Sequence, residues 1–317
     1  MVATEIRGPE DVVSDGEGRF FTGAADGTIW RLTLPESGAV RAVPVAHTRG
    51  RPLGLEPAPK GRLLVCDAQR GLLHVDTHDG AVRVLAGEAG GERLRFCSNV
   101  AEAADGTLYF SVSSRRYGLE DWMGGILEHT GTGQLLRLLP GGEPEVLLDG
   151  LHFANGVALA EDESFVLVAE SGAYRLRRLW LTGPRSGQCE MLAEGLPGFP
   201  DNISRGPGDV FWVALAGPRE RGVDLLHRMP PRAGRAAWRA AKSFRPRPRR
   251  TVRILALSSD GDVVCDLRRA KSPYRMVTGV CRSGSFLIMG SLVENGLAVC
   301  ELPPSITAST GSFQNLR

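Results

Sequence analysis

The chain has 317 residues, of which 42% are hydrophobic and 23% charged, so it can bury a full core and is neither disordered nor fibrous. Its 40 glycines and 20 prolines indicate many tight turns, as in an all-β protein. We find no run of eighteen apolar residues and no apolar leader after Met1, and therefore expect a soluble, cytoplasmic protein.

A short apolar strand that follows a turn recurs six times along the chain. The repeats begin at Gly18, Gly61, Gly106, Glu163, Gly208 and Gly284. Their period is about 45 residues once two longer gaps are set aside, and a second strand follows most of them. The two gaps contain the only helical patterns, near Tyr117–His129 and Pro231–Phe244. The sequence therefore predicts one six-bladed β-propeller over residues 1–317, with two small helical insertions, rather than a β-sandwich.

The second insertion, residues 217–253, carries most of the positive charge. Twelve Lys and Arg stand against two acids between Arg219 and Arg253, a local charge of +10 in a chain whose formal net charge is +2. Its basic residues fall partly at helical spacing, so we expect a solvated, partly helical cover over the propeller. The alternative is contact of Arg232–Arg250 with an anionic membrane surface. We expect no nucleic acid partner, because no aromatic residues are interleaved for base stacking.

The repeat also predicts which side chains meet at the centre of the propeller. Positions eight residues before each first strand should converge on the axis, and they are Glu10, Leu53, Ser98, Asn155, Pro200 (beside Asp201) and Met276. Two carboxylates and an amide oxygen are hard ligands that suit Ca²⁺, Mg²⁺ or Mn²⁺. The alternative is that Glu10, Asn155 and Asp201 each serve a local turn.

Several segments carry a family resemblance. They are GPED at Gly8–Asp11, GRPLGL at Gly50–Leu55, LLDGLHFANGVAL at Leu147–Leu159, LVAES at Leu167–Ser171 and GLPGFPDNI at Gly195–Ile203. The chain resembles the strictosidine-synthase-like branch of six-bladed propellers, which is related to senescence-marker lactonases (gluconolactonases) and paraoxonases. The resemblance implies a divalent metal, usually Ca²⁺, with Mg²⁺, Mn²⁺ or Zn²⁺ as alternatives. Its implied ligands match Glu10, Asn155 and Asp201, with a further Asn at the position of Ser98.

The chain departs from this family pattern at identifiable positions. The usual Asn-Asp pair is Ser98-Asn99 here, and Val112 stands where an Asp is common. Either Ser98 or Asn99 then serves as a ligand, or the site has lost its metal and no cofactor is bound. The paraoxonase-type histidines and the strictosidine synthase glutamate are absent, the former near Leu53 and Ala68 and the latter near Met276–Val277.

Other residues are candidates for catalysis or substrate binding. Asp201 could accept a proton from an attacking water, and His152, three residues before Asn155, is a second candidate base. Candidate substrate contacts are Leu53, Asp67, Tyr117, Glu170 and Met276. The alternative for each polar one is structural, since Asp67 can form a turn, His152 can lie at a strand edge and Tyr117 can anchor a short helix.

Three functions are consistent with these features. The first is a metal-dependent hydrolase that acts on a small-molecule lactone or ester, as in lactonases and arylesterases. The second is a natural-product biosynthetic cyclase or condensing enzyme of the Pictet-Spengler kind, which would use the same central pocket. The third is a non-catalytic propeller that binds a partner through the basic insertion.

Overall fold

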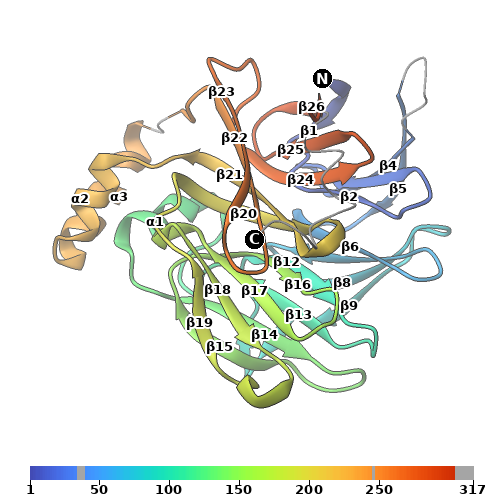
Figure 1. The fold of residues 1–317 in the computed structure, drawn as a ribbon, viewed down its shortest axis with the longest axis horizontal. Helices are drawn as coiled ribbons and strands as arrows, with labels where there is room; N and C mark the ends of the chain where they lie inside the picture. Colours follow the sequence, from blue (N-terminus) through green and yellow to red (C-terminus); the bar gives the residue numbers. More distant parts are fainter. Residues whose placement is uncertain (34–39, 245–246, 304–317) are drawn as a thin grey trace, which may run out of the picture.

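The computed structural model describes residues 1–33, 40–244 and 247–303. It confirms the predicted six-bladed β-propeller, which three short helices accompany (Figure 1). Each blade is a four-stranded antiparallel sheet, and its strands follow one another in the chain from the centre outward in five of the six blades. The short turns between consecutive strands explain why the repeat was visible in the sequence.

The strands of each blade have the following bounds. Blade one contains β2 (Val12–Ser14), β3 (Arg19–Gly23), β4 (Thr28–Thr33) and β5 (Arg41–His47). Blade two contains β6 (Pro52–Ala58), β7 (Arg62–Asp67), β8 (Gly71–Asp76) and β9 (Val82–Ala86). Blade three contains β12 (Cys97–Glu102), β13 (Leu108–Val112), β14 (Gly133–Leu138) and β15 (Glu145–Leu151). Blade four contains β16 (Ala154–Leu159), β17 (Phe165–Glu170), β18 (Arg175–Trp180) and β19 (Cys189–Ala193). Blade five contains β20 (Gly198–Arg205), β21 (Phe211–Pro218), β22 (Thr251–Leu257) and β23 (Val263–Ala270).

Blade six joins the two ends of the described chain. Its inner strands are β24 (Val277–Ser283), β25 (Phe286–Ser291) and β26 (Asn295–Glu301), and its outer strand is β1 (Val2–Arg7). The antiparallel pairing of β1 with β26 joins the two ends of the chain in one blade and so closes the ring of blades. A small hairpin of β10 (Glu88–Ala89) and β11 (Glu92–Arg93) and single 3₁₀ turns at Leu119–Asp121, Ser171–Ala173, Gly183–Arg185 and Pro207–Asp209 complete the strand-rich part.

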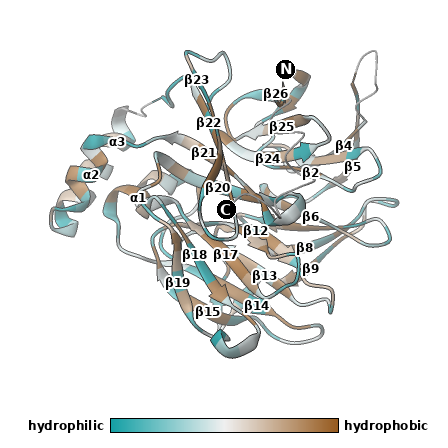
Figure 2. Ribbon diagram, in the orientation of Figure 1, coloured by the Kyte–Doolittle hydropathy of each residue, from teal (hydrophilic) through white to brown (hydrophobic). Residues whose placement is uncertain are grey.

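The blades pack face to face through apolar strands, as β17 shows. All six of its residues are buried. Val166 and Val168 point into the core shared with blade three, whereas Leu167 and Ala169 point into the core shared with blade five. A strand buried on both faces is a continuous apolar run, because side chains alternate between two hydrophobic layers. Figure 2 shows the same concentration of hydrophobic residues in the inner strands.

Three helices form a cover at one side of the propeller (Figure 1). They are α1 (Trp122–Glu128), α2 (Arg221–His227) and α3 (Pro231–Phe244). We refer to these three helices as the helical cover. The helices predicted near Tyr117–His129 and Pro231–Phe244 correspond to α1 and α3, and α2 was not expected. None of the helices in the described part of the chain is both long and apolar enough to cross a bilayer.

Candidate functional site

The innermost strands of five blades are irregular at the same place. The pairing of each with its neighbour shifts register across one residue pair, namely Leu53-Gly54, Ser98-Asn99, Asn155-Gly156, Asp201-Asn202 and Thr278-Gly279. Glu10 and Asp11 directly precede the innermost strand of blade one. A bulge re-aims the side chains beside it, so these pairs turn side chains toward the centre of the ring.

The first residue of every pair lines one cavity at the centre of the propeller. The cavity has a volume of about 710 Å³, and these six lining residues are Glu10, Leu53, Ser98, Asn155, Asp201 and Thr278. The structure therefore brings together the three residues predicted as metal ligands, Glu10, Asn155 and Asp201, with Ser98 beside them.

In blade six the predicted residue and the bulged residue differ. Met276, the predicted substrate contact, lines it, but the bulged position belongs to Thr278. The Thr278 hydroxyl donates a 2.6 Å hydrogen bond to the backbone oxygen of Glu10, which links blades six and one. Sequence spacing missed Thr278; the glycine that follows it, as in Asn155-Gly156, was the available signal.

The second residue of a pair is either a glycine or a polar residue, and the two asparagines among them form hydrogen bonds next to the cavity. Asn99 Nδ2 donates to Asn202 Oδ1 at 3.2 Å, and Asn202 Nδ2 in turn donates to both carboxylate oxygens of Glu10 at 3.2 and 3.3 Å. Asn99 Oδ1 accepts the backbone N–H of Val157 at 2.9 Å. Of the two alternatives, Ser98 lines the cavity and Asn99 does not.

The carboxyl groups of the site are buried. Glu10 is 5% exposed and Asp201 7%. Burial, reinforced by the negative charges of Asp201 and Asp11, raises the pKa of Glu10 well above its usual value. Burial and the charge of Asp11 likewise raise the pKa of Asp201. Oδ1 of Asp201 is buried without a hydrogen-bond partner in the described structure. Two such carboxyl groups need a shared proton or a cation nearby.

Arg51 supplies part of the compensating charge. Its side chain is buried, and its guanidinium donates to the backbone oxygens of Gly8 at 2.8 Å and Pro52 at 3.1 Å. Its positive charge lowers the pKa of Glu10, against the larger effect of burial. Its hydrogen bonds go to carbonyl groups rather than to carboxylates. Arg51 therefore favours the ionised form of Glu10 by its charge and leaves the carboxylate oxygens free for a ligand.

The donor set fits a hard divalent cation. Glu10 and Asp201 offer carboxylate oxygens, Asn155 an amide oxygen and Ser98 a hydroxyl, and all four residues line the same cavity. Among the described residues, no three His, Cys, Asp or Glu side chains form a metal-holding group, so the amide and hydroxyl oxygens are needed to complete a site. Oxygen ligands of this kind suit Ca²⁺ or Mg²⁺ better than a thiolate-seeking metal.

The walls of the cavity are apolar and come from both the propeller and the helical cover. Phe96 and Phe153 meet edge to face at 5.4 Å on the propeller side. The helical cover adds Trp122 and Ile126 from α1 and Val223 from α2. The polar atoms of the cavity floor therefore lie beneath a largely hydrophobic space, as in many small-molecule sites.

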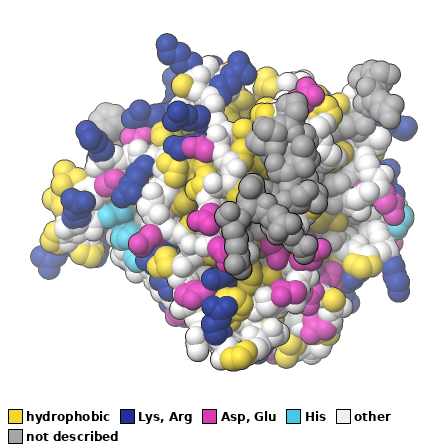
Figure 3. All heavy atoms as spheres, in the orientation of Figure 1, with side chains coloured by type: hydrophobic (Ala, Val, Ile, Leu, Met, Phe, Trp, Pro, Cys, Tyr) yellow, Lys and Arg dark blue, Asp and Glu magenta, His cyan; other side chains and the backbone are white. Residues whose placement is uncertain are grey.

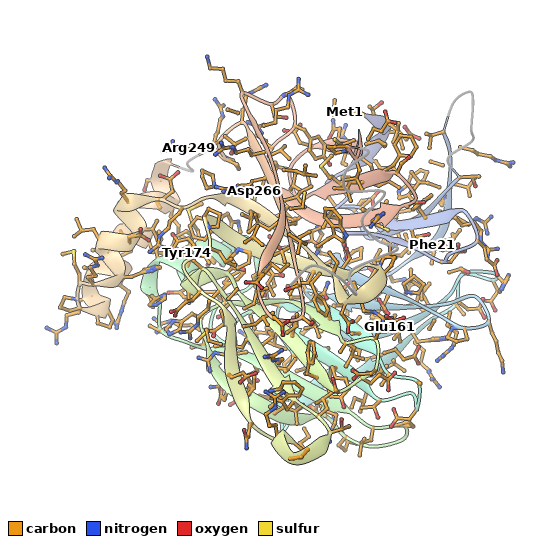
Figure 4. The ribbon with its side chains drawn as sticks, viewed as in Figure 1. Met1, Phe21, Glu161, Tyr174, Arg249 and Asp266 are labelled. Carbon is orange, nitrogen blue, oxygen red and sulfur yellow. The ribbon has the colours of Figure 1, made fainter. Side chains whose placement is uncertain are left out.

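The last part of the cavity wall is basic. Arg249 lies where the chain leaves α3 for β22 (Figure 4), and it lines the cavity while its guanidinium pairs with Glu220 at 2.6 Å. Arg247 lines the cavity beside it. Glu220 lines the cavity too and balances Arg249, so the excess positive charge on this side comes from Arg247.

Besides Asn99, four of the predicted site residues lie outside the lining of this cavity in the described structure. Asp67 accepts the backbone N–H groups of Gln69 at 2.9 Å and Arg70 at 3.1 Å, as a turn former does. Glu170 accepts the backbone N–H of His152 at 2.8 Å and is paired with Arg175 and Arg177. The ring of Tyr117 packs edge to face against Trp238 of α3 at 6.3 Å.

His152, the fourth, belongs to a stack of three histidines. The ring of His129 lies 3.8 Å from the ring of His152 on one side and 3.8 Å from that of His227 on the other, with interplanar angles of 18°. Burial, followed by its histidine neighbours, lowers the pKa of His129 to about 3, and burial lowers those of the other two. These residues are far apart in the sequence, so spacing gave no sign of the stack.

The fold and site define a class: a six-bladed propeller with carboxylate and amide groups at its centre, beneath a covered apolar cavity. The strictosidine synthase family model matches residues 99–184, and the strictosidine synthase-like N-terminal model matches residues 1–32. The chain is 36% identical over 229 residues to the rat (Rattus norvegicus) adipocyte plasma membrane-associated protein, covering 68% of this chain and 61% of that protein. It is 38% identical over 232 residues to strictosidine synthase-like protein 10 of Arabidopsis thaliana, covering 67% and 62%.

Solved structures agree on the fold. A gluconolactonase from Xanthomonas campestris superimposes with a TM-score of 0.65 at 16% identity, covering 94% of this chain and 87% of that one. The calcium-binding protein regucalcin from Agrobacterium tumefaciens gives 0.62 at 16% identity, covering 96% and 87%. The chain is thus similar in sequence to strictosidine-synthase-like proteins, and it shares the six-bladed propeller fold with the gluconolactonase and the regucalcin. It spans about three fifths of the length of the curated relatives named above.

Proposed function

We propose that this protein is a metal-dependent hydrolase of a small-molecule lactone or ester. The observation that carries the proposal is the unpartnered Oδ1 of Asp201, which lies beside Glu10 on the floor of an apolar cavity. A buried carboxylate oxygen without a partner is costly unless a ligand uses it. The names of two structural neighbours, a gluconolactonase and a calcium-binding regucalcin, support the same choice.

Glu10, Asn155 and Asp201 would hold the cation, with Ser98 as the fourth oxygen donor. When bound, a divalent cation supplies Lewis-acid chemistry, which polarises a carbonyl group and stabilises negative charge on its oxygen. The protein contributes the geometry, because the bulged strands and the hydrogen bonds from Asn202 to Glu10 fix the donors before substrate arrives.

Asp201 is the proposed general base. It lines the cavity and its free oxygen can accept a proton from a water molecule beside the substrate carbonyl. Burial raises the pKa of this carboxyl group, which makes its carboxylate form a stronger base. His152 is less suited to this role, because its ring lies in the histidine stack, outside the cavity lining.

The hydrophobic walls would bind the apolar part of the substrate and exclude bulk water. Phe96, Phe153 and Trp122 enclose the space above the polar floor. A cavity of about 710 Å³ accommodates a drug-sized molecule. These walls, rather than the ring of polar groups, would determine which lactone or ester is accepted.

The test is a panel of lactones and aryl esters assayed after chelation and after Ca²⁺, Mg²⁺, Mn²⁺ or Zn²⁺ is added back. We expect one cation to restore hydrolysis, and Asp201→Asn to lower kcat by about 100-fold or more. Glu161→Gln, an exposed change on a propeller loop, is the matched control and should leave the rate unchanged. Full activity in the metal-free protein would refute the proposal, and so would condensation of an amine with an aldehyde without any hydrolysis.

A further inference from the structure

Helix α2 and the short segment that joins it to α3 each expose one large apolar side chain. Leu225 is 63% exposed and Met229 is 49% exposed, although both lie in the most basic part of the chain. Figure 3 shows hydrophobic and basic side chains side by side at the end of the molecule formed by α2 and α3. We refer to Arg221–Arg232 as the cover tip.

The arginines of this region outnumber its acids. Asp224 pairs with Arg219 at 2.8 Å and Glu220 pairs with Arg249 at 2.6 Å, which uses both acids between Arg219 and Arg253. Along α2, α3 and the segment between them, four exposed arginines have no ion-pair partner among the described residues: Arg221, Arg228, Arg232 and Arg239. Their charge is therefore available to an external anionic surface.

The spacing of the cover tip separates an outer from an inner face. Arg221 and Leu225 are four residues apart on α2, so they share one side of the helix, and Met229 follows two residues after the helix ends. On α2, Val223 and Leu226 instead line the central cavity. One short segment thus contacts the cavity on its inner side and presents apolar groups flanked by positive charge on its outer side.

We propose that the cover tip docks on an anionic lipid surface, with Leu225 and Met229 inserted among the lipids and the arginines against the headgroups. Apolar side chains gain free energy when they enter a bilayer, and basic residues near an anionic leaflet add to the attraction. A nucleic acid would satisfy the arginines but leave Leu225 and Met229 in water. Docking in this way would hold the apolar cavity close to the lipid surface.

Sedimentation of the full chain with vesicles tests the proposal. We expect binding to vesicles of phosphatidylcholine and phosphatidylglycerol in equal parts, little binding to phosphatidylcholine alone, and loss of binding as salt screens the charges. Leu225→Ser with Met229→Ser should weaken the binding by about tenfold, because two apolar insertions are lost. Arg228→Ser with Arg232→Ser should weaken it to a similar extent and reduce the dependence on salt.

Matched controls lie on the blades. Val84→Ser with Val146→Ser removes two apolar groups that are each 42% exposed, and Arg83→Ser with Arg95→Ser removes two exposed charges. Neither control should alter vesicle binding. Equal binding to neutral vesicles would overturn the proposal. Binding that survives Leu225→Ser with Met229→Ser but is displaced by duplex DNA would overturn it in favour of a polyanion site. Because no step depends on catalysis, these outcomes are independent of the proposed hydrolysis.

Discussion

The hydroxyl of Ser98 donates a 3.0 Å hydrogen bond to Oδ1 of Asn155, which joins the innermost strands of blades three and four at the cavity floor. Asn155 Nδ2 donates in turn to the hydroxyl of Ser171 at 3.3 Å, so both ends of the amide are fixed. Ser98 is a short side chain here, and it offers a hydroxyl where the family resemblance implies an amide oxygen.

We expect Ser98→Asn to tighten calcium binding. An amide oxygen in place of the hydroxyl adds a stronger ligand to a charged centre, an effect of about 1–2 kcal/mol, or roughly tenfold in Kd. Calorimetric titration of the wild type and the variant with Ca²⁺ measures the change. The gain should vanish in a Ser98→Asn, Asp201→Asn double variant, because the carboxylate is lost. Unchanged or weaker binding by Ser98→Asn would contradict a ligand role for this position.

We expect Glu10→Gln and Asp201→Asn to stabilise the metal-free protein at neutral pH while removing its response to calcium. The raised pKa values mean that the folded state binds protons more readily than the unfolded state, so these groups make the free energy of unfolding fall as pH rises above about 4. An amide has no charge to bury, so it avoids this loss of stability. The free energy of unfolding of each metal-free variant should therefore be higher by about 1 kcal/mol or more at pH 7.

Melting scans in chelator and in calcium measure both effects. The exposed Glu143→Gln is the control and should change neither curve. Variants that are less stable than the wild type in chelator would show that the two carboxyl groups serve the fold rather than a cation.

The histidine stack predicts a pH dependence of the opposite sign. The pKa values of His129, His152 and His227 are lowered in the folded state. Below about pH 6.5, the usual pKa of a histidine, the unfolded state therefore binds more protons than the folded state. The free energy of unfolding should therefore fall as pH decreases from about 6.5, with the contribution of His129 extending to about 3.

Urea unfolding at pH 7 and pH 5 measures this dependence. A His129→Gln variant should lose less stability than the wild type between the two values, because it removes the central ring. His78→Gln, at an exposed turn, is the control and should keep the wild-type dependence. An equal loss in His129→Gln and the wild type would contradict the role of the stack.

Gly156→Ala tests the close contact between blades four and five. A Cβ at this position would lie 2.4 Å from the backbone oxygen of Asp201 and 2.5 Å from the backbone nitrogen of Ile203. We expect a loss of stability of about 1–3 kcal/mol, as for an overpacked core, and weaker calcium binding, because Asp201 must move. A Cβ at Gly222 on α2 would meet no neighbouring atom within 4 Å, so Gly222→Ala should not lower the melting temperature. A neutral Gly156→Ala would show that Asp201 is not held by this contact.

Much of the architecture followed from the sequence. Strands buried on both faces are continuous apolar runs, and the turns between them recur, so six repeats predicted six blades. Equivalent positions of the repeats face the same axis of the ring. Glu10, Asn155 and Asp201 could therefore be predicted to lie close together although they are distant in the chain. That grouping needed only the regularity of the fold.

Two kinds of feature could be found only in the tertiary structure: the bulges in the inner strands and the contacts between distant segments. A bulge changes which neighbouring residue points inward, so counting from strand starts could not choose between Ser98 and Asn99 or find Thr278 in blade six. The stack of His129 with His152 and His227 and the exposure of Leu225 depend on how the helical cover packs on the ring. Such contacts join residues with no common period, and only the closing of the propeller and its cover brings them together.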